Sequence, residues 1–109
     1  MNPDKVVREH VRQFTDLPNI GPAMARDFAA LGFDEPGQLA GADPLELYVS
    51  LCREKHRYQD PCVLDVFMSV TDFLAGSEAQ PWWHFTEARK RRYAAAVLQA
   101  RRDFALNIR

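Results

Sequence analysis

The sequence predicts an all-α fold of about five helices, and three observations support this. Apolar residues recur at the helical spacing of three and four positions in several stretches. Val and Ile do not alternate with polar residues, as they would in a half-buried strand. Gly and Pro separate the periodic stretches and suit helix ends and first turns. With 109 residues, 47% of them hydrophobic, the chain is expected to form one packed domain.

The first two expected helices flank a tight turn at residues 17–22. Residues 4–14 are expected to form the first helix, and its apolar stripe is formed by Val7, Val11 and Phe14. The second helix is expected to begin at Pro22, where a missing N–H costs nothing, and to end at Gly32. A short helical turn is expected over residues 36–40.

Two Asp-Pro pairs, at Asp43 and Asp60, predict the starts of the next two helices, because Asp caps a helix and Pro suits its first turn. Gly76 is expected to end the fourth helix. Thr86 is expected to cap a last helix that continues to Ile108. Each of these helices has an apolar stripe. The stripe of the helix after Asp43 consists of Leu45, Tyr48, Val49 and Cys52, and that of the helix after Asp60 consists of Val63, Val66, Phe67, Val70, Phe73 and Leu74. The stripe of the last helix consists of Tyr93, Val97, Ala100, Phe104 and Ile108.

Charge is distributed unevenly along the chain, although the formal total is only −1. Residues 1–85 contain seven basic and thirteen acidic residues, a net charge of −6. Residues 86–109 contain seven basic and two acidic residues, a net charge of +5. The total argues against a strongly basic nucleic-acid binder, whereas the distribution describes an acidic body with a basic C-terminal segment.

Several functional classes are not supported by the sequence. It contains no run of roughly eighteen apolar residues for a membrane span, and its N-terminus is too polar for a signal peptide. We therefore expect a cytoplasmic protein with no membrane partner. The sequence has no phosphate-binding GxxxxGK[ST] loop, no GxSxG elbow and no HExxH motif. Because spacing alone assembles no nucleophile and base, we expect no enzymatic activity and no cofactor.

Residues 17–25, Leu-Pro-Asn-Ile-Gly-Pro-Ala-Met-Ala, resemble the helix-hairpin-helix motif, whose usual pattern is Leu-Pro-Gly-Ile-Gly-Pro-Lys-Thr-Ala. Asn19 replaces the first glycine, and Asn tolerates a left-handed backbone. Ile20 is expected to be buried between the two helices, and Gly21 to let the backbone approach a phosphate. Ala23 and Met24 stand where DNA-binding hairpins carry Lys and Thr, so two side-chain contacts to phosphate are missing.

The resemblance implies a binding site for nucleic-acid backbone, in which N–H groups at the start of the second helix point at a phosphate. The candidate residues are Asn19, Ile20, Gly21, Pro22, Ala23, Met24 and Arg26 in the hairpin, and Arg89, Lys90, Arg91 and Arg92 in the basic segment. An alternative interpretation is that the hairpin serves only to pack two helices against each other.

Four blocks in this order give a wider resemblance. They are Gly32-Phe33 with Pro36 and Leu39, Asp43-Pro44 with Leu47-Tyr48, residues 60–67, and Pro81-Trp82-Trp83. Residues 14–92 resemble the bacterial pathogenicity-locus family of small helix-hairpin-helix proteins, members of which have been labelled mitomycin-resistance proteins. The first blocks also resemble the C-terminal domain of TfoX-type competence regulators.

This resemblance implies a tandem helix-hairpin-helix-like (SAM-like) bundle with a long basic C-terminal helix. The expected organisation is one domain, residues 1–109. It contains a hairpin core at residues 4–58, a helix at residues 60–75 and the basic helix at residues 86–108.

Cys52, His56, Cys62 and His84 are weak candidates for a metal site, because zinc accepts these donors but the spacing matches no common zinc module. We expect two thiols packed in the interior and two surface histidines instead. Cys62 lies in a helix's first turn, where the dipole would lower the thiol pKa, whereas Asp60 beside it would raise that pKa. We therefore interpret Cys62 as a buried, packed thiol and not as a redox group.

Asp65, Ser69 and Asp72 share one face of a predicted helix. This face is expected to be solvated or to pack against a cationic partner, and the basic helix of the same chain is a candidate. Trp82 and Trp83 precede that helix. We expect them to cover the core, one buried and one partly exposed, although aromatic rings beside cations also stack nucleic-acid bases.

The function predicted from the sequence is non-enzymatic, sequence-independent binding of nucleic-acid backbone, with DNA as the candidate partner. The alternative is a protein–protein interaction module, binding another protein or a second copy of this chain, that keeps the hairpin as a scaffold. The choice depends on whether the hairpin and the basic helix lie on one surface.

Overall fold

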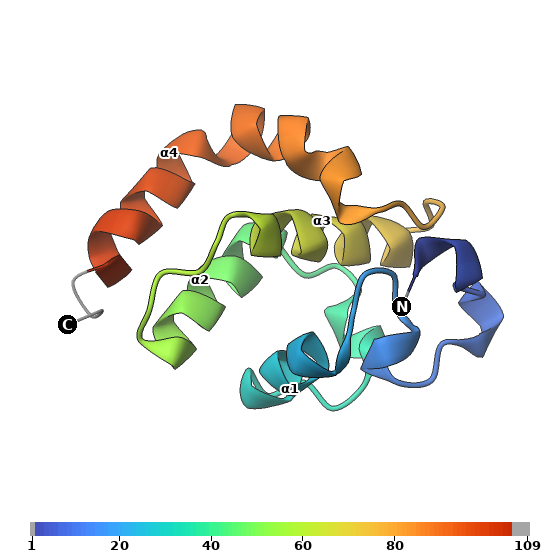
Figure 1. Ribbon diagram of the computed structural model, residues 1–109. Coiled ribbons are helices and arrows are strands. Elements are labelled where there is room, and N and C mark those ends of the chain that lie inside the picture. Colours follow the sequence, from blue (N-terminus) through green and yellow to red (C-terminus); the bar gives the residue numbers. More distant parts are fainter. Residues whose placement is uncertain (1, 106–109) are drawn as a thin grey trace.

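The chain is all-α, as the sequence predicts. The computed structural model describes residues 2–105, and this part of the chain contains four α-helices and no β-strand (Figure 1). The helices are α1 (Pro22–Ala30), α2 (Pro44–Lys55), α3 (Cys62–Leu74) and α4 (Thr86–Ala105). Single 3₁₀ turns, at Pro3–Lys5, Arg8–His10, Phe14–Asp16, Pro36–Leu39 and Trp82–Phe85, connect and precede them.

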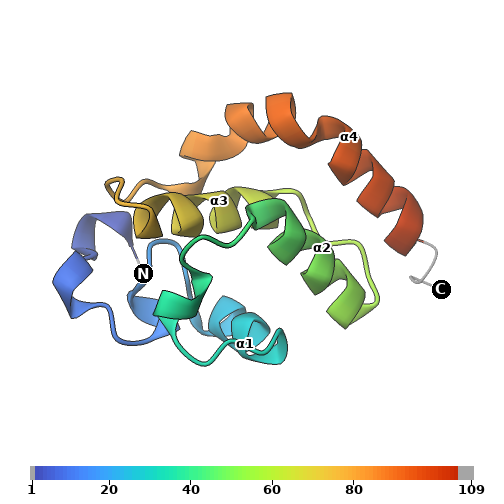
Figure 2. The same cartoon turned by 180° about the vertical axis from the view of Figure 1, so that it is seen from behind.

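Helix α3 runs through the middle of the molecule. Figure 1 shows α4 on one side of α3 and α1 on the other, and Figure 2 shows the same order from behind. Helix α2 packs against both α3 and α4. Because α3 has neighbours on several sides, it carries the largest share of buried residues, including one carboxylate, Asp65.

The core forms where the turn before α1, helix α2 and helix α3 meet. The ring of Phe28 is fully buried there, with ring centroids 5.2 Å from Phe14 and 5.6 Å from Phe67. The other apolar side chains with no exposed area include Leu17, Ile20, Leu39, Tyr48, Cys52, Leu64, Phe67 and Val70. Ile20 is buried, as expected, but it does not lie between two α-helices, because a single 3₁₀ turn at Phe14–Asp16 precedes it in place of the first expected helix.

The helix expected over residues 4–14 does not form. This segment consists of separate 3₁₀ turns joined by residues in extended conformation, among them Val6, Val7 and Val11. β-Branched residues favour extended backbone. The guanidinium of Arg8 also donates hydrogen bonds of 2.6 Å to the carbonyl oxygens of Phe73 and Ser77. These contacts hold the segment around the end of α3 and override the helical spacing of its apolar residues.

The helix starts agree with the Pro and Asp signals, with two shifts. Asp43 caps α2, and its carboxylate accepts a hydrogen bond of 2.9 Å from the N–H of Leu45. Asp60 accepts one of 2.8 Å from the N–H of Cys62, but the capping position itself is Pro61. Thr86 was expected to cap the last helix, but it is the first residue of α4 and its hydroxyl bonds elsewhere. Ile108, expected on the stripe of this helix, lies outside the described residues.

Candidate nucleic-acid interface

The turn before α1 is held in place by Asn19. Its backbone is left-handed, with φ of 65°, as the substitution for glycine predicts. Its side-chain Nδ2 donates hydrogen bonds of 2.9 Å to the hydroxyl oxygen of Ser69 and 2.8 Å to the carbonyl oxygen of Gln80. The side chain therefore ties the turn to α3 and to the segment before α4. No feature of the sequence predicts these two long-range contacts.

The start of α1 has no side-chain cap. Gly21 occupies the capping position, is exposed, and has no atom within 4 Å of the place where a Cβ would lie. Pro22 has no N–H, and the helix's first backbone bond is donated by Ala25. Within residues 2–105, no side chain accepts from the N–H groups of Ala23 and Met24. Unlike α2 and α3, which carry Asp carboxylates at their starts, α1 presents uncapped N–H groups.

Cations are sparse around this helix. Arg26, one turn into α1, is exposed. Lys55, from the end of α2, forms an ion pair of 3.2 Å with Asp27 of α1. Arg26 is therefore the cation on α1 itself that remains available to an anion at the helix start.

Helix α4 is joined to α3 by a buried ion pair. Arg89 Nε donates a hydrogen bond of 2.8 Å to Asp65 Oδ1, and the Thr86 hydroxyl donates one of 2.8 Å to Asp65 Oδ2. Asp65 is completely buried and the Arg89 side chain is 15% exposed. The hydrogen bond that Arg89 donates to the Asp65 carboxylate raises the pKa of Arg89 above its ordinary value. Asp65 of the predicted α3 face therefore packs against the basic helix of the same chain.

The four cations at the beginning of α4 therefore differ in availability. Arg89 was a candidate phosphate contact, but it points inward and its charge is paired with Asp65. Lys90, Arg91 and Arg92 are exposed, and Lys90 lies 4.0 Å from the carboxylate of Glu87. Arg91 and Arg92 form no ion pair with any residue between 2 and 105.

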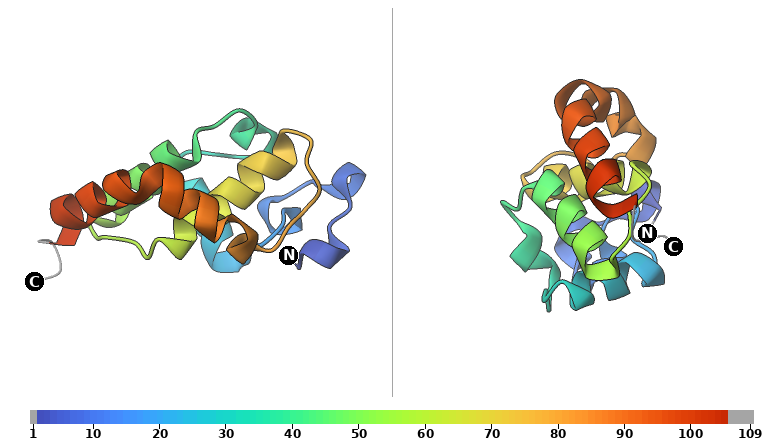
Figure 3. Two further views of the ribbon diagram at one scale, coloured as in Figure 1. Left: turned by 90° about the horizontal axis from the view of Figure 1, so that it is seen from above. Right: turned by 90° about the vertical axis from the view of Figure 1, so that its left-hand side faces the viewer.

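The start of α1 and the basic helix α4 do not share one surface. In Figure 1 and in the right-hand view of Figure 3, α1 and α4 lie on opposite sides of the molecule, with α3 between them. The candidate residues therefore fall into two separate groups, one at the start of α1 and one on α4. A single phosphate cannot contact both groups.

The remaining polar candidates on α3 do not act together. Ser69 is buried, donates to the carbonyl oxygen of Val66 at 2.6 Å and accepts from Asn19. Asp72 is partly buried and lines a cavity between α3 and α4. Of the predicted face, Asp65 and Ser69 hold other segments against α3, and only Asp72 faces open space.

The cysteines and histidines do not converge. Cys52 is fully buried and His56 and His84 are exposed. Within residues 2–105, no three His, Cys, Asp or Glu side chains are arranged to hold a metal ion. Partial burial, and then the carboxylate of Asp60, raise the pKa of Cys62 to about 11, so this thiol is protonated at neutral pH. The effect of burial exceeds that of the helix dipole considered in the sequence.

The two tryptophans differ from the expectation that one is buried. Trp82 is only partly buried, and Trp83 is 64% exposed. Their rings meet edge to face, with centroids 5.7 Å apart. They therefore lie at the surface beside the start of α4.

None of the helices in the described part of the chain is long and apolar enough to cross a membrane.

Comparison with known proteins finds one matching family and a similar protein. A family model described as pathogenicity locus (Cdd1) matches residues 7–91. The mitomycin resistance protein McrB of Streptomyces lavendulae is 44% identical over 77 residues, which is 71% of this chain and 73% of that protein. No solved structure is significantly similar.

Proposed function

This chain belongs to the pathogenicity-locus family, and we propose that it is a non-enzymatic protein that binds nucleic-acid backbone without sequence preference through the start of α1. In this proposal residues 14–30 take the role of a helix-hairpin-helix, with the 3₁₀ turn Phe14–Asp16 in place of the first helix, and DNA is the candidate partner. The observation that carries the proposal is the uncapped start of α1 at Gly21.

Two features favour an anion at this position. The free N–H groups of Ala23 and Met24 and the dipole of α1 together give a local positive potential. The open space beside Gly21 leaves room for a phosphate to approach the backbone. Asn19 fixes the turn through Ser69 and Gln80, so the N–H groups are positioned before the ligand arrives.

The charge distribution sets the expected salt dependence. Each phosphate neutralised by a cation contributes about −0.9 to the slope of log K against log salt for duplex DNA. With Arg26 as the available cation, we expect a slope near −1. A slope of about −3 would instead indicate that Lys90, Arg91 and Arg92 supply the contacts.

The test is fluorescence anisotropy of labelled duplex and single-stranded oligonucleotides across a salt series. Gly21→Asp places a carboxylate at the capping position, as Asp43 does in α2, so the helix stays folded while phosphate is repelled. We expect affinity to fall about tenfold or more. Gly37→Asp is the control, because it makes the same charge change at another exposed glycine with open space.

Two outcomes would contradict the proposal. One is the absence of binding at low salt. The other is an equal loss of affinity in Gly21→Asp and Gly37→Asp, since that loss would reflect total charge alone. The thermal unfolding of each variant, followed by circular dichroism, shows whether the fold is retained.

The name of the relative offers a cellular measurement. Because that protein is named a mitomycin resistance protein, we propose that producing this chain raises the survival of a sensitive bacterial strain on mitomycin. The Gly21→Asp chain should give less protection than the unmodified chain. Equal survival with and without the chain would contradict this part of the proposal.

A second candidate function is a protein-interaction module, favoured by one observation on α4. Leu98 is 48% exposed and has exposed Ala94 one turn before it, which makes an apolar strip on the outer side of the helix. Light scattering across a concentration series tests self-association. Association that Leu98→Glu abolishes, together with no oligonucleotide binding, would support this function over the first.

A further inference from the structure

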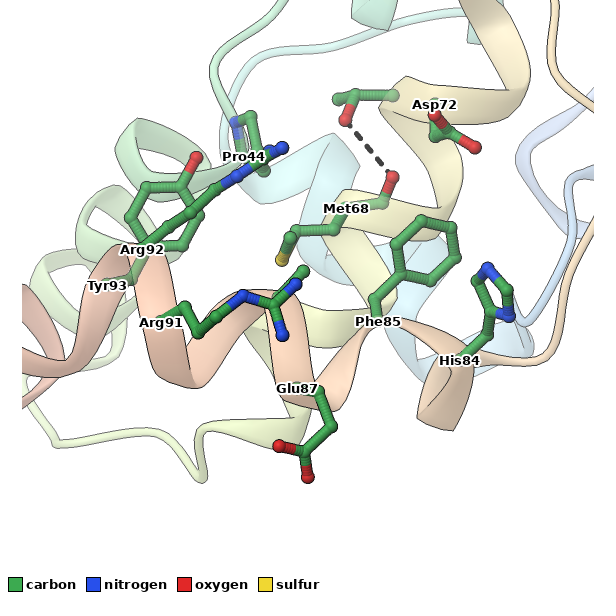
Figure 4. Close-up of a pocket in the computed structure, with 11 residues that line it drawn as sticks. Pro44, Met68, Asp72, His84, Phe85, Glu87, Arg91, Arg92 and Tyr93 are labelled. Atoms are coloured by element: carbon green, nitrogen blue, oxygen red, sulfur yellow. Dashed lines mark hydrogen bonds between the residues drawn. The ribbon is translucent and has the colours of Figure 1, made fainter.

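A cavity of about 480 Å³ lies between α3, the first half of α4 and the start of α2. This volume is within the range of roughly 300–1,000 Å³ typical of small-molecule sites. Its lining residues include Met68, Asp72, Phe85, Arg91, Arg92 and Tyr93. Figure 4 shows the cavity close up, and Figure 1 shows that α4, which supplies several of its lining residues, lies on the side of α3 opposite α1.

Two unpaired cations border the cavity. Figure 4 shows the guanidinium of Arg91 pointing into it and that of Arg92 extending toward Pro44. Neither group has a carboxylate partner among residues 2–105. Glu87 also borders the cavity, but its side chain is 79% exposed and extends away from it (Figure 4). An anionic group of a ligand would find two guanidinium groups without displacing an existing ion pair.

Apolar and aromatic side chains form one part of the cavity wall, which is otherwise mostly polar. Met68, which is only 5% exposed, forms part of the wall on α3. In Figure 4 the rings of Phe85 and Tyr93 lie on opposite sides of Met68 and Arg91. A thioether and aromatic rings make favourable contacts with a flat aromatic group. The ligand is therefore expected to carry an aromatic ring as well as an anion.

Asp72 adds a third requirement. It reaches the cavity from α3 and is partly buried. An ionised carboxylate only accepts hydrogen bonds, so it repels a purely anionic ligand and favours one with N–H donors. Among nucleic-acid bases, guanine presents two adjacent N–H donors on one edge, which match the two oxygens of a carboxylate.

From these three requirements we propose that the α3–α4 cavity binds one nucleotide. The base lies against Met68 between Phe85 and Tyr93, and the phosphate binds Arg91 and Arg92. Asp72 accepts hydrogen bonds from the base and gives a preference for guanine. The nucleotide comes from the free pool or from an unpaired position in a strand. This site goes beyond the proposed backbone contact at α1 and uses none of its residues.

Isothermal titration calorimetry with the four 5′-mononucleotides tests the proposal, with guanosine and inorganic phosphate as partial ligands. The fluorescence of Trp82 and Trp83 gives a second readout, because they belong to the same 3₁₀ turn as Phe85. We expect guanosine monophosphate to bind at least tenfold more tightly than guanosine or phosphate alone. Arg91→Gln should weaken its binding about tenfold or more, since hydrogen bonds to a charged group are lost.

Matched variants separate the contributions. Arg101→Gln removes the same charge from α4 outside the cavity and should leave nucleotide affinity unchanged. Asp72→Asn should remove the preference for guanine while the contribution of the phosphate persists. Gly21→Asp should not affect this site, so the proposal and the backbone-binding function fail independently.

The source of the nucleotide follows from short single-stranded oligonucleotides in the same titration. Binding no tighter than that of the mononucleotide assigns the free nucleotide, and much tighter binding that Arg91→Gln weakens assigns an unpaired position in a strand. The proposal is overturned if neither ligand saturates at millimolar concentration. It is equally overturned if phosphate alone binds as well as the nucleotide, or if Arg91→Gln and Arg101→Gln have the same effect.

Discussion

The ion pair between Asp65 and Arg89 is expected to contribute strongly to stability. Removing one partner of a buried ion pair costs about 3–5 kcal/mol, because the other charge stays buried without compensation. Asp65→Asn keeps the size of the side chain, so no cavity adds to the cost. Arg89 is 15% exposed and can regain some hydration, which places the expected loss near the lower limit, about 3 kcal/mol. For a domain of this size that corresponds to a fall in Tm of about 10–20 °C.

Urea unfolding, followed by tryptophan fluorescence and by circular dichroism, measures this loss. Asp72→Asn is the matched control, because it makes the same chemical change on α3 at a partly exposed carboxylate without an ion pair, and should cost less than about 0.5 kcal/mol. The double variant Asp65→Leu/Arg89→Met should recover most of the stability, since it leaves no unpaired charge. A loss below about 1 kcal/mol for Asp65→Asn would refute the reasoning.

Three further predictions concern the Asn19 turn, the Cys62 thiol and the Arg8 contacts. Asn19→Ala should lower the free energy of unfolding in urea by about 2–3 kcal/mol, because it loses hydrogen bonds and forces Ala into a left-handed backbone. Asn19→Gly should lower it by only about 1 kcal/mol, since Gly accepts that backbone. Equal losses for the two variants would contradict this prediction. Because the pKa of Cys62 is raised to about 11, the rate of its alkylation should rise about tenfold per pH unit from pH 8 to pH 10. Asp60→Asn should increase that rate at pH 8. A rate that reaches a plateau near pH 8.5 would contradict the raised pKa. Arg8→Ala should destabilise the chain by about 1–2 kcal/mol and increase hydrogen exchange in the N-terminal segment, because it removes the guanidinium that lies 4.0 Å from the centre of the Phe73 ring. Arg8→Lys should restore little of this stability, because Lys lacks the fork geometry of Arg. Full restoration by Lys would contradict that explanation.

The structural features that the sequence predicts correctly depend on interactions between residues close together in the chain. Pro22 and Asp43 mark helix starts through the chemistry of the first turn, which acts within a few residues. Asn19 indicated a left-handed turn for the same reason. The face of Asp65, Ser69 and Asp72 suggested a cationic partner such as the basic helix, and Asp65 does pair with Arg89 of α4.

The features that the sequence could not provide depend on distant contacts. Residues 4–14 have the spacing of a helix, but Arg8 bonds to carbonyl oxygens 65 and 69 positions away and the segment follows the end of α3 instead. The sequence also could not place α1 and α4 on opposite sides of α3, since that depends on the path of the connecting segments. The nucleotide-sized cavity has the same origin, because its residues come from three separate helices and the turn before α4.

The contacts of Asn19 also bear on how the chain folds. Its two hydrogen-bond partners are 50 and 61 residues away in sequence, so they form only after long loops have closed. Such non-local contacts raise the contact order and are expected late, after the neighbouring helices have begun to assemble. A peptide of residues 14–30 alone would therefore lack the anchors of the turn. The shape of the candidate phosphate site is thus a property of the completed domain, although its motif occupies nine consecutive residues.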